Sequence, residues 1–180
     1  MKSDIQREIE IPEGIEVNAN NKVISVKSQG KELKREFNSG NVEISKQDKK
    51  ILISAKKATK RESKIIGTIA AHIKNMIKGV IEGYEYLLQI CSVHFPITVT
   101  ADKENINIKN FLGETTPRKA KIVPGVQVKI EGDIIKLSSP NIESAGQTAA
   151  NLETATKIKN RDRTRFQDGI WIINKAGEEM

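Results

Sequence analysis

Residues 41–54 read NVEISKQDKKILIS, and residues 126–139 read VQVKIEGDIIKLSS. Each stretch alternates aliphatic and polar residues, passes through a polar turn and then enters a second aliphatic run. A period of two places alternate side chains on one face of a strand, so each stretch predicts a β-hairpin. Val42 and Ile44 match Val126 and Val128 at an offset of 84 residues (126 minus 42). The two hairpins are therefore predicted to be copies of one another.

A helix is predicted to follow the first hairpin, after the segment KKATKRESK. Thr59 and Glu62, three residues apart, match a capping box, and Gly83 lies just past the predicted end. The apolar positions recur every three or four residues and form one stripe: Ile66, Ile69, Ile73, Ile77 and Val80.

A second helix is predicted from about Asn141, a suitable N-cap, to about Lys157. Its inner stripe is rich in small residues, which predicts close packing against the sheet: Ile142, Ala145, Ala149, Leu152 and Ala155. Gly67 matches Gly146 at an offset of 79 (146 minus 67), so the first copy carries five extra residues (84 minus 79). They fall in the segment SAKKATKRESK, which leads into the first helix.

The sequence thus predicts an α+β protein of two tandem duplicated units. Each unit is expected to be a mostly antiparallel sheet covered on one face by one helix. The predicted units are residues 1–84 and residues 85–180. Uncovered sheet faces and strand edges would then be available to a partner.

Charge indicates the kind of partner. The 180 residues include 30 Lys and Arg against 23 Asp and Glu, which gives a net charge of +7 and predicts a polyanionic ligand. A solvated basic surface without a ligand is the alternative. The single cysteine, Cys91, excludes an internal disulfide and is expected to be buried. No apolar run is long enough to span a membrane, so we expect a soluble cytoplasmic protein with no membrane partner.

Catalytic and metal-binding patterns are absent from the sequence. No phosphate-binding loop or dinucleotide fingerprint opens either helix, and one cysteine with two separated histidines does not make a typical zinc site. His94 is expected to stabilise a turn, Asp168 to open an Asp-Gly turn, and Asp162 to form an ion pair among arginines. We expect no enzyme, no cofactor, no metal and no small-molecule substrate.

Basic residues gather in three segments. The first lies between Lys46 and Lys64, with its excess charge placed in a loop before the first helix, where Lys56, Lys57, Lys60 and Arg61 are candidate phosphate contacts. The second is a hairpin tip within residues 109–121. It carries three further candidates: Arg118, Lys119 and Lys121.

The third segment, residues 157–165, is called the basic arm below. In an extended chain its alternating cations would all point to one side: Lys157, Lys159, Arg161, Arg163 and Arg165. Arginine binds phosphate oxygens bidentately and stacks on bases, which lysine does poorly. The run from Phe166 to Ile173 is expected to bury itself as a strand and so to hold the arm in place. Neither predicted helix offers a polar, base-reading face, which favours structured RNA over DNA.

Four fragments, taken together and in this order, resemble the large-subunit ribosomal protein L-six family in its archaeal and eukaryotic branch: VHFPI, IKNFLGE, AGQTAAN and NRDRTRFQDGIWI. The resemblance spans nearly the whole chain. The family's arginine-rich signature matches this chain at Arg161, Asp162, Arg163, Arg165, Phe166, Asp168 and Gly169.

The resemblance implies two sheet-plus-helix units that bind large-subunit ribosomal RNA, mostly through the second unit. It also implies neighbouring ribosomal proteins as partners and a position near the RNA where translational GTPases dock. A free RNA-binding chaperone or translational regulator is the alternative function.

Overall fold

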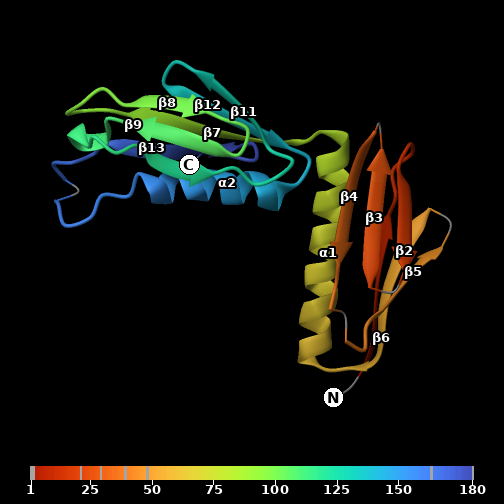
Figure 1. Ribbon diagram of the computed structural model, residues 1–180. Helices are drawn as coiled ribbons and strands as arrows, with labels where there is room; N and C mark the ends of the chain where they lie inside the picture. The colour runs from red at the N-terminus through yellow and green to blue at the C-terminus, as the bar shows by residue number, and fades with distance from the viewer. Residues whose placement is uncertain are drawn as a thin grey trace. The chain divides into compact units, whose positions relative to one another are not determined.

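The computed structural model describes residues 3–20, 22–28, 30–38, 40–47, 49–162 and 164–179. The chain divides into two compact units, Met1–Glu82 and Gly83–Met180. Gly83, the first residue of the second unit, has a φ of +78°, a conformation that favours glycine. Figure 1 shows the strands and helices of the chain.

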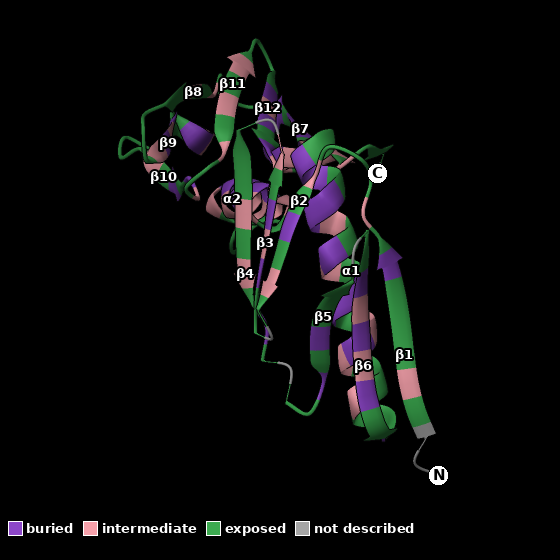
Figure 2. Ribbon diagram, turned by 90° about the vertical axis from the view of Figure 1, so that its right-hand side faces the viewer, coloured by how far each residue is buried: buried purple, intermediate pink, exposed green. Residues whose placement is uncertain are grey.

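Unit 1 contains two antiparallel three-stranded sheets, ordered β1-β6-β5 and β2-β3-β4. Its strands are β1 (Ser3–Glu10), β2 (Glu16–Asn20), β3 (Val23–Ser28), β4 (Lys31–Glu36), β5 (Glu43–Gln47) and β6 (Lys50–Ala58). Helix α1 (Lys60–Ile81) packs on strands of both sheets. The predicted stripe of α1 is buried throughout, and buried and more exposed residues alternate along β6 (Figure 2).

The start of α1 follows the prediction, but the residues before it do not. Thr59 is the N-cap, and it forms the predicted capping box with Glu62. The prediction of a loop from Lys56 onward is wrong, since β6 continues to Ala58 and α1 begins at Lys60. Extra residues lengthen the strand, since β6 has nine residues and β12 has six, and β1 pairs with the end of β6 through an irregularity between Ser3 and Ile5. There Lys57 has a φ of +50°, and its amide donates to Asp4 Oδ1 at 2.8 Å.

Unit 2 also contains two antiparallel sheets, ordered β10-β9-β8 and β11-β12-β7-β13-β14. Its elements are β7 (Tyr84–Cys91), β8 (Thr98–Ala101), β9 (Asn105–Lys109), the 3₁₀ turn η1 (Phe111–Gly113), β10 (Arg118–Lys121), β11 (Gln127–Glu131), β12 (Ile134–Ser139), α2 (Ile142–Ala155), β13 (Gly169–Lys175) and β14 (Glu178–Glu179). Asn141 caps α2 as predicted, accepting the amide of Glu143 at 3.0 Å.

The duplication predicted from sequence is visible in the sheets. The order β1-β6-β5 in unit 1 matches β7-β12-β11 in unit 2. Both predicted hairpins are present, and the residues that pair across them match as well: Ile51 lies opposite Ile9, while Ile135 lies opposite Leu88. The predicted α+β class with tandem duplicated units is confirmed. Unit 2 departs from the repeat by adding β13 and β14 beyond β7.

The close packing predicted for α2 is also present. A methyl group built on Gly146 would lie 3.1 Å from the Tyr86 hydroxyl oxygen, tighter than an ordinary contact. The equivalent residue of α1, Gly67, has far more room, because a methyl group there would meet only the Arg7 guanidinium at 4.0 Å.

This difference predicts opposite outcomes for one substitution made in both repeats. Gly67→Ala should stabilise the protein by about 0.5–1 kcal/mol, because alanine loses less backbone entropy in a helix than glycine. Gly146→Ala should lose that gain to its contact with Tyr86 and unfold earlier than Gly67→Ala. Urea unfolding of both variants against the parent measures the difference. Equal stabilisation by both substitutions would contradict the close approach of α2 to β7.

Candidate nucleic-acid interface

The basic arm follows α2 directly and forms a turn. Asn160 has a φ of +58°, and Asp162 Oδ1 accepts the Thr164 amide at 2.9 Å and the Thr164 hydroxyl at 2.8 Å. The amides of Arg165 and Phe166 both donate to the Asp162 carbonyl, at 3.2 and 3.0 Å. The prediction of an extended, alternating arm is therefore wrong, because Asp162 accepts nearby amides and Asn160 takes a left-handed conformation.

The arm nevertheless presents its cations to solvent. Lys157, Lys159, Arg161 and Arg165 are all exposed, and none of them pairs with a carboxylate within the described part of the chain. Arg163, the fifth predicted contact, lies outside the described residues. The guanidinium carbon of Arg161 lies 4.8 Å from the centre of the Phe166 ring, a cation–π contact that orients this side chain.

The far end of the arm is held by Asp168, whose side chain is only 1% exposed. Its Oδ1 accepts the amides of Val93 and His94 at 2.8 and 2.9 Å, and its Oδ2 lies 2.6 Å from His94 Nδ1. The His94 ring stacks on Phe166 at 4.8 Å. Asp168, predicted to open an Asp-Gly turn, is instead a buried hydrogen-bond acceptor, and Asp162, predicted to form an ion pair, instead stabilises a turn.

These contacts control the ionisation of Asp168. Burial opposes the charged form, but the hydrogen bonds from the His94 amide, the His94 ring and the Val93 amide outweigh it. The pKa of the Asp168 carboxyl is consequently lower than its usual value, and the group is a carboxylate at neutral pH.

The predicted anchoring strand is present as β13, which pairs antiparallel with β7. Ile170 is fully buried, lies opposite Ile90 and donates its amide to the buried Thr156 hydroxyl at 3.0 Å. Trp171 and Ile172 are only half-buried, so the burial expected of the whole run is concentrated in Ile170. The chain thus leaves α2 at Thr156, passes through the arm and contacts Thr156 again at Ile170.

Arg118, on β10, makes its contacts inside the protein. Its Nε and Nη2 donate to Glu114 at 2.8 and 2.6 Å, and its Nη1 donates to the Ala155 carbonyl at 2.8 Å and the Lys157 carbonyl at 3.4 Å. The guanidinium also covers the buried Phe111 ring at 4.3 Å. The hydrogen bonds from Arg118 lower the pKa of Glu114. Arg118 therefore links β10 to the start of the arm, at the carbonyls of Ala155 and Lys157.

The remaining predicted contacts are not gathered at the arm. Lys119 and Lys121 are exposed on β10, alternating with Arg118 and the buried Ala120, so they lie on the strand face opposite to these two. The other four candidates are exposed in unit 1, at the end of β6 and the start of α1: Lys56, Lys57, Lys60 and Arg61.

A cavity of about 430 Å³ lies beside the arm. It is lined by Cys91, Val93, Ile158, Phe166, Gln167 and Trp171. Cys91 is half-buried rather than buried as predicted. Trp171 is the only tryptophan of the chain, so its fluorescence reports on this surface.

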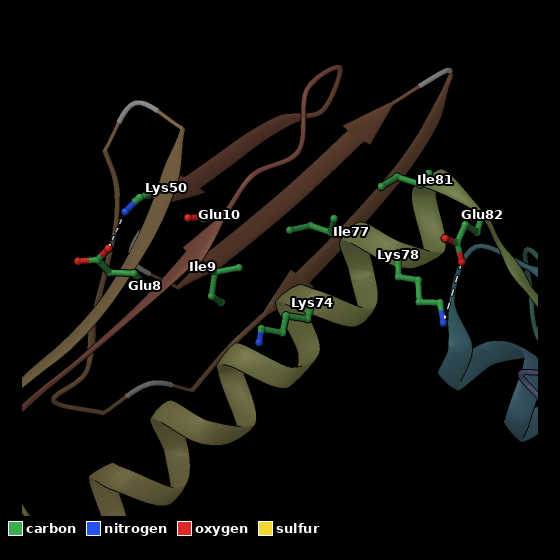
Figure 3. Close-up of a pocket in the computed structure, with 9 residues that line it drawn as sticks. All are labelled: Glu8, Ile9, Glu10, Lys50, Lys74, Ile77, Lys78, Ile81 and Glu82. Carbon is green, nitrogen blue, oxygen red and sulfur yellow. Dashed lines mark hydrogen bonds and ion pairs between the residues drawn. The ribbon is translucent and has the colours of Figure 1, made fainter. Parts of the chain in front are cut away.

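Unit 1 has a cavity of a different character, about 510 Å³ in volume (Figure 3). Its wall mixes aliphatic residues with charges of both signs, and two of the cations are paired: Lys50 with Glu8 at 3.0 Å and Lys78 with Glu82 at 4.0 Å. Balanced charge of this kind does not favour a polyanion.

Two groups in the region escaped sequence reasoning. Glu114 is one of them, although its spacing of four from Arg118 is a signal that suggests the pair. Thr156 carries no such signal, since its hydroxyl meets Ile170 only in the folded chain.

Within the described ranges, no group of three acidic, histidine or cysteine side chains is placed to hold a metal ion. None of the described helices is long and apolar enough to cross a membrane.

The fold and the arm define a small basic α+β protein that is built by duplication. It exposes cations on a turn that hydrogen bonds hold in place. The sequence model of the family described as "Ribosomal protein L6" matches residues 11–83 and 95–169, and the chain belongs to that family.

Two archaeal relatives, both named "Large ribosomal subunit protein uL6", agree with this. The protein of Methanococcus vannielii is 47% identical over 176 residues, covering 98% of this chain and 97% of the relative. The protein of Methanobrevibacter smithii is 46% identical over 171 residues, covering 95% and 96%. The chain is therefore a structural component of the large ribosomal subunit and not an enzyme, which places it in the ribosome, in the cytoplasm. The family resemblance inferred from sequence is confirmed.

Proposed function

We propose that the chain binds large-subunit ribosomal RNA through the basic arm of unit 2, near the region where translational GTPases dock. The observation that carries the proposal is the arm itself: exposed cations without carboxylate partners in the described residues, on a turn fixed at both ends. Neighbouring ribosomal proteins complete the environment of the chain. The proximity to GTPases rests on the family resemblance.

Fixing the arm lowers the entropy lost on binding. The Asp162 carbonyl accepts amides of the arm itself. On either side of the arm, the Thr156 hydroxyl accepts the Ile170 amide and the Asp168 carboxylate accepts the His94 amide. Because each immobilised side chain or loop residue otherwise opposes association, a preformed turn binds more tightly than a flexible one of equal charge. Arg161 is further restrained by the Phe166 ring.

The other predicted contacts take secondary roles in this proposal. Arg118 is a positioning residue, since its guanidinium holds the carbonyls of Ala155 and Lys157 at the root of the arm. Lys119 and Lys121 reach RNA from the opposite face of β10, and the unit 1 group at Lys56, Lys57, Lys60 and Arg61 makes a second, separate contact. Such dispersed phosphate contacts suit folded RNA, which is bound largely through backbone and shape.

The salt dependence of binding tests the electrostatic part of the proposal. If the five arm cations, from Lys157 to Arg165, neutralise about five phosphates, log K should fall with log salt at a slope of roughly −4. The measurement is a titration of large-subunit RNA followed by Trp171 fluorescence or filter binding, from low to moderate salt. A slope near zero would remove charge neutralisation as the mechanism.

Specificity separates this function from the alternative. Footprinting on large-subunit RNA should give one compact protected region near the factor-docking site. Diffuse protection, or similar affinity for unrelated RNAs, would favour a free RNA chaperone or translational regulator instead.

A further inference from the structure

The two repeats differ at one sheet edge. In unit 2 the outer edge of β7 is paired with β13. In unit 1 the equivalent strand is β1, whose only partner among the described strands is β6. Figure 2 shows β1 as the outermost strand of its sheet.

The cavity of unit 1 lies at this edge. The matching pairs Ile51–Ile9 and Ile135–Leu88 make Ile9 the equivalent of Leu88, the residue that Ile172 of β13 faces. Ile9 lines the cavity together with Ile77 and Ile81 of α1 (Figure 3). By the offset of 79, Ile77 corresponds to Thr156 (77 plus 79), the residue that holds the start of β13. The wall of the cavity therefore matches the wall against which β13 packs.

We propose that the edge of β1 and this cavity form an acceptor site for a β-strand of a neighbouring ribosomal protein. The incoming strand runs antiparallel to β1, as β13 runs to β7, and places aliphatic side chains at alternate positions. One of them enters the cavity between Ile9 and Ile77, and the adjoining one covers Ile81. Strand addition of this kind uses main-chain hydrogen bonds for affinity and side-chain pockets for selectivity.

Three observations favour this occupant. Ile81 is 45% exposed, one of the few large aliphatic side chains of the described chain to be so open. An unpaired strand edge beside exposed aliphatic side chains invites pairing with another chain. The chain itself also shows, in unit 2, that this fold accepts a strand at the equivalent edge.

Charge favours protein over RNA at this site. The residues lining the cavity include three carboxylates and three ammonium groups, so the wall is neutral overall: Glu8, Glu10 and Glu82 with Lys50, Lys74 and Lys78. Glu8 and Glu10 lie on the edge strand itself, where an RNA phosphate would meet repulsion.

Photo-cross-linking of this chain to its neighbours in the assembled large subunit tests the proposal directly. A photoreactive benzoyl-phenylalanine replaces Ile81, and in a matched variant it replaces Val23, which is 42% exposed on β3 of the same unit. Irradiation should join position 81 to one protein, at a segment with alternating aliphatic residues, and position 23 should not give that product. A cross-link from position 81 to RNA, to a helix of another protein, or to nothing would overturn the proposal.

A competition experiment measures the effect of the site on assembly. In reconstitution with an equal mixture of wild-type protein and Ile81→Arg, we expect the variant to be incorporated roughly five- to ten-fold less, as for a central apolar interface residue. Val23→Arg should be incorporated like wild type. Both variants should retain wild-type binding to isolated large-subunit RNA, because neither Ile81 nor Val23 belongs to the RNA contacts proposed above. Equal incorporation of Ile81→Arg and Val23→Arg would overturn strand addition without affecting the RNA-binding proposal.

Discussion

Replacing Lys159, Arg161 and Arg165 together by glutamine is expected to reduce affinity for large-subunit RNA on the order of 100-fold at physiological salt. Each lost phosphate contact also removes the release of its counterion, so the salt slope should become shallower by about 0.7–0.9 per residue. These three side chains are exposed and take no part in the hydrogen bonds that shape the turn. Glutamine therefore removes charge while leaving the fold of the arm in place.

The matched control removes the same charge elsewhere on unit 2. Lys103, Lys129 and Lys175 are exposed and lie outside the proposed interface. Their joint replacement by glutamine should leave affinity within a few-fold of wild type, and filter binding across a salt series compares the two triple variants. An equal loss in both would mean that net charge, rather than the position of the arm, governs binding.

Asp168→Ala is expected to lower the free energy of unfolding by roughly 2–4 kcal/mol, more than any single change in the arm that Asp168 holds in place. It leaves the amides of Val93 and His94 without their buried acceptor and frees the His94 ring from its carboxylate partner. Urea unfolding measures the loss. Asp162→Ala is the matched control, because that carboxylate is exposed and its removal should alter the stability much less.

The same carboxylate predicts a pH dependence. The folded-state pKa of Asp168 lies below its ordinary value of 3.8, so its stabilisation is fully present above about pH 4. As the pH falls through the lowered folded-state pKa, the carboxylate is protonated and the stabilisation is lost. Wild type should therefore lose stability faster than Asp168→Ala on acidification below pH 4. Parallel acid-unfolding curves for the two proteins would show that Asp168 is not the group responsible.

Periodicity predicted most of the fold because each repeat carries its own signals. The alternation at Val42 and Ile44 and the capping pair Thr59 and Glu62 are local patterns, and local patterns survive in the folded structure. The offset between the copies then supplied the tandem arrangement. The split of each unit into two sheets was not predicted, because it depends on pairing between strands far apart in the sequence, such as β1 with β6.

The arm shows where reading by pattern fails. Alternating cations suggested an extended chain, but Asn160 takes a positive φ and the Asp162 side chain accepts the Thr164 amide, so the segment turns instead. The contacts of Arg118 with the Ala155 carbonyl, and of Asp168 with the Val93 amide, join residues 37 and 75 positions apart. Such pairings depend on tertiary structure, and the spacing of residues in the sequence does not predict them. Composition located the basic segments but not the side chains that hold them.

The place of β13 in the chain has a consequence for the order of events during synthesis. The arm is closed only when Ile170 reaches Thr156, and β13 (Gly169–Lys175) follows α2 and strands β7 to β12 in the chain. Unit 1 and α2 can fold while the chain is still growing, since domains fold from the N-terminus as they emerge. Until β13 docks, the edge of β7 is open and residues 157–168 are tethered at one end only. We expect a nascent chain without β13 to bind RNA weakly, so tight binding begins only after β13 has been made and has paired with β7.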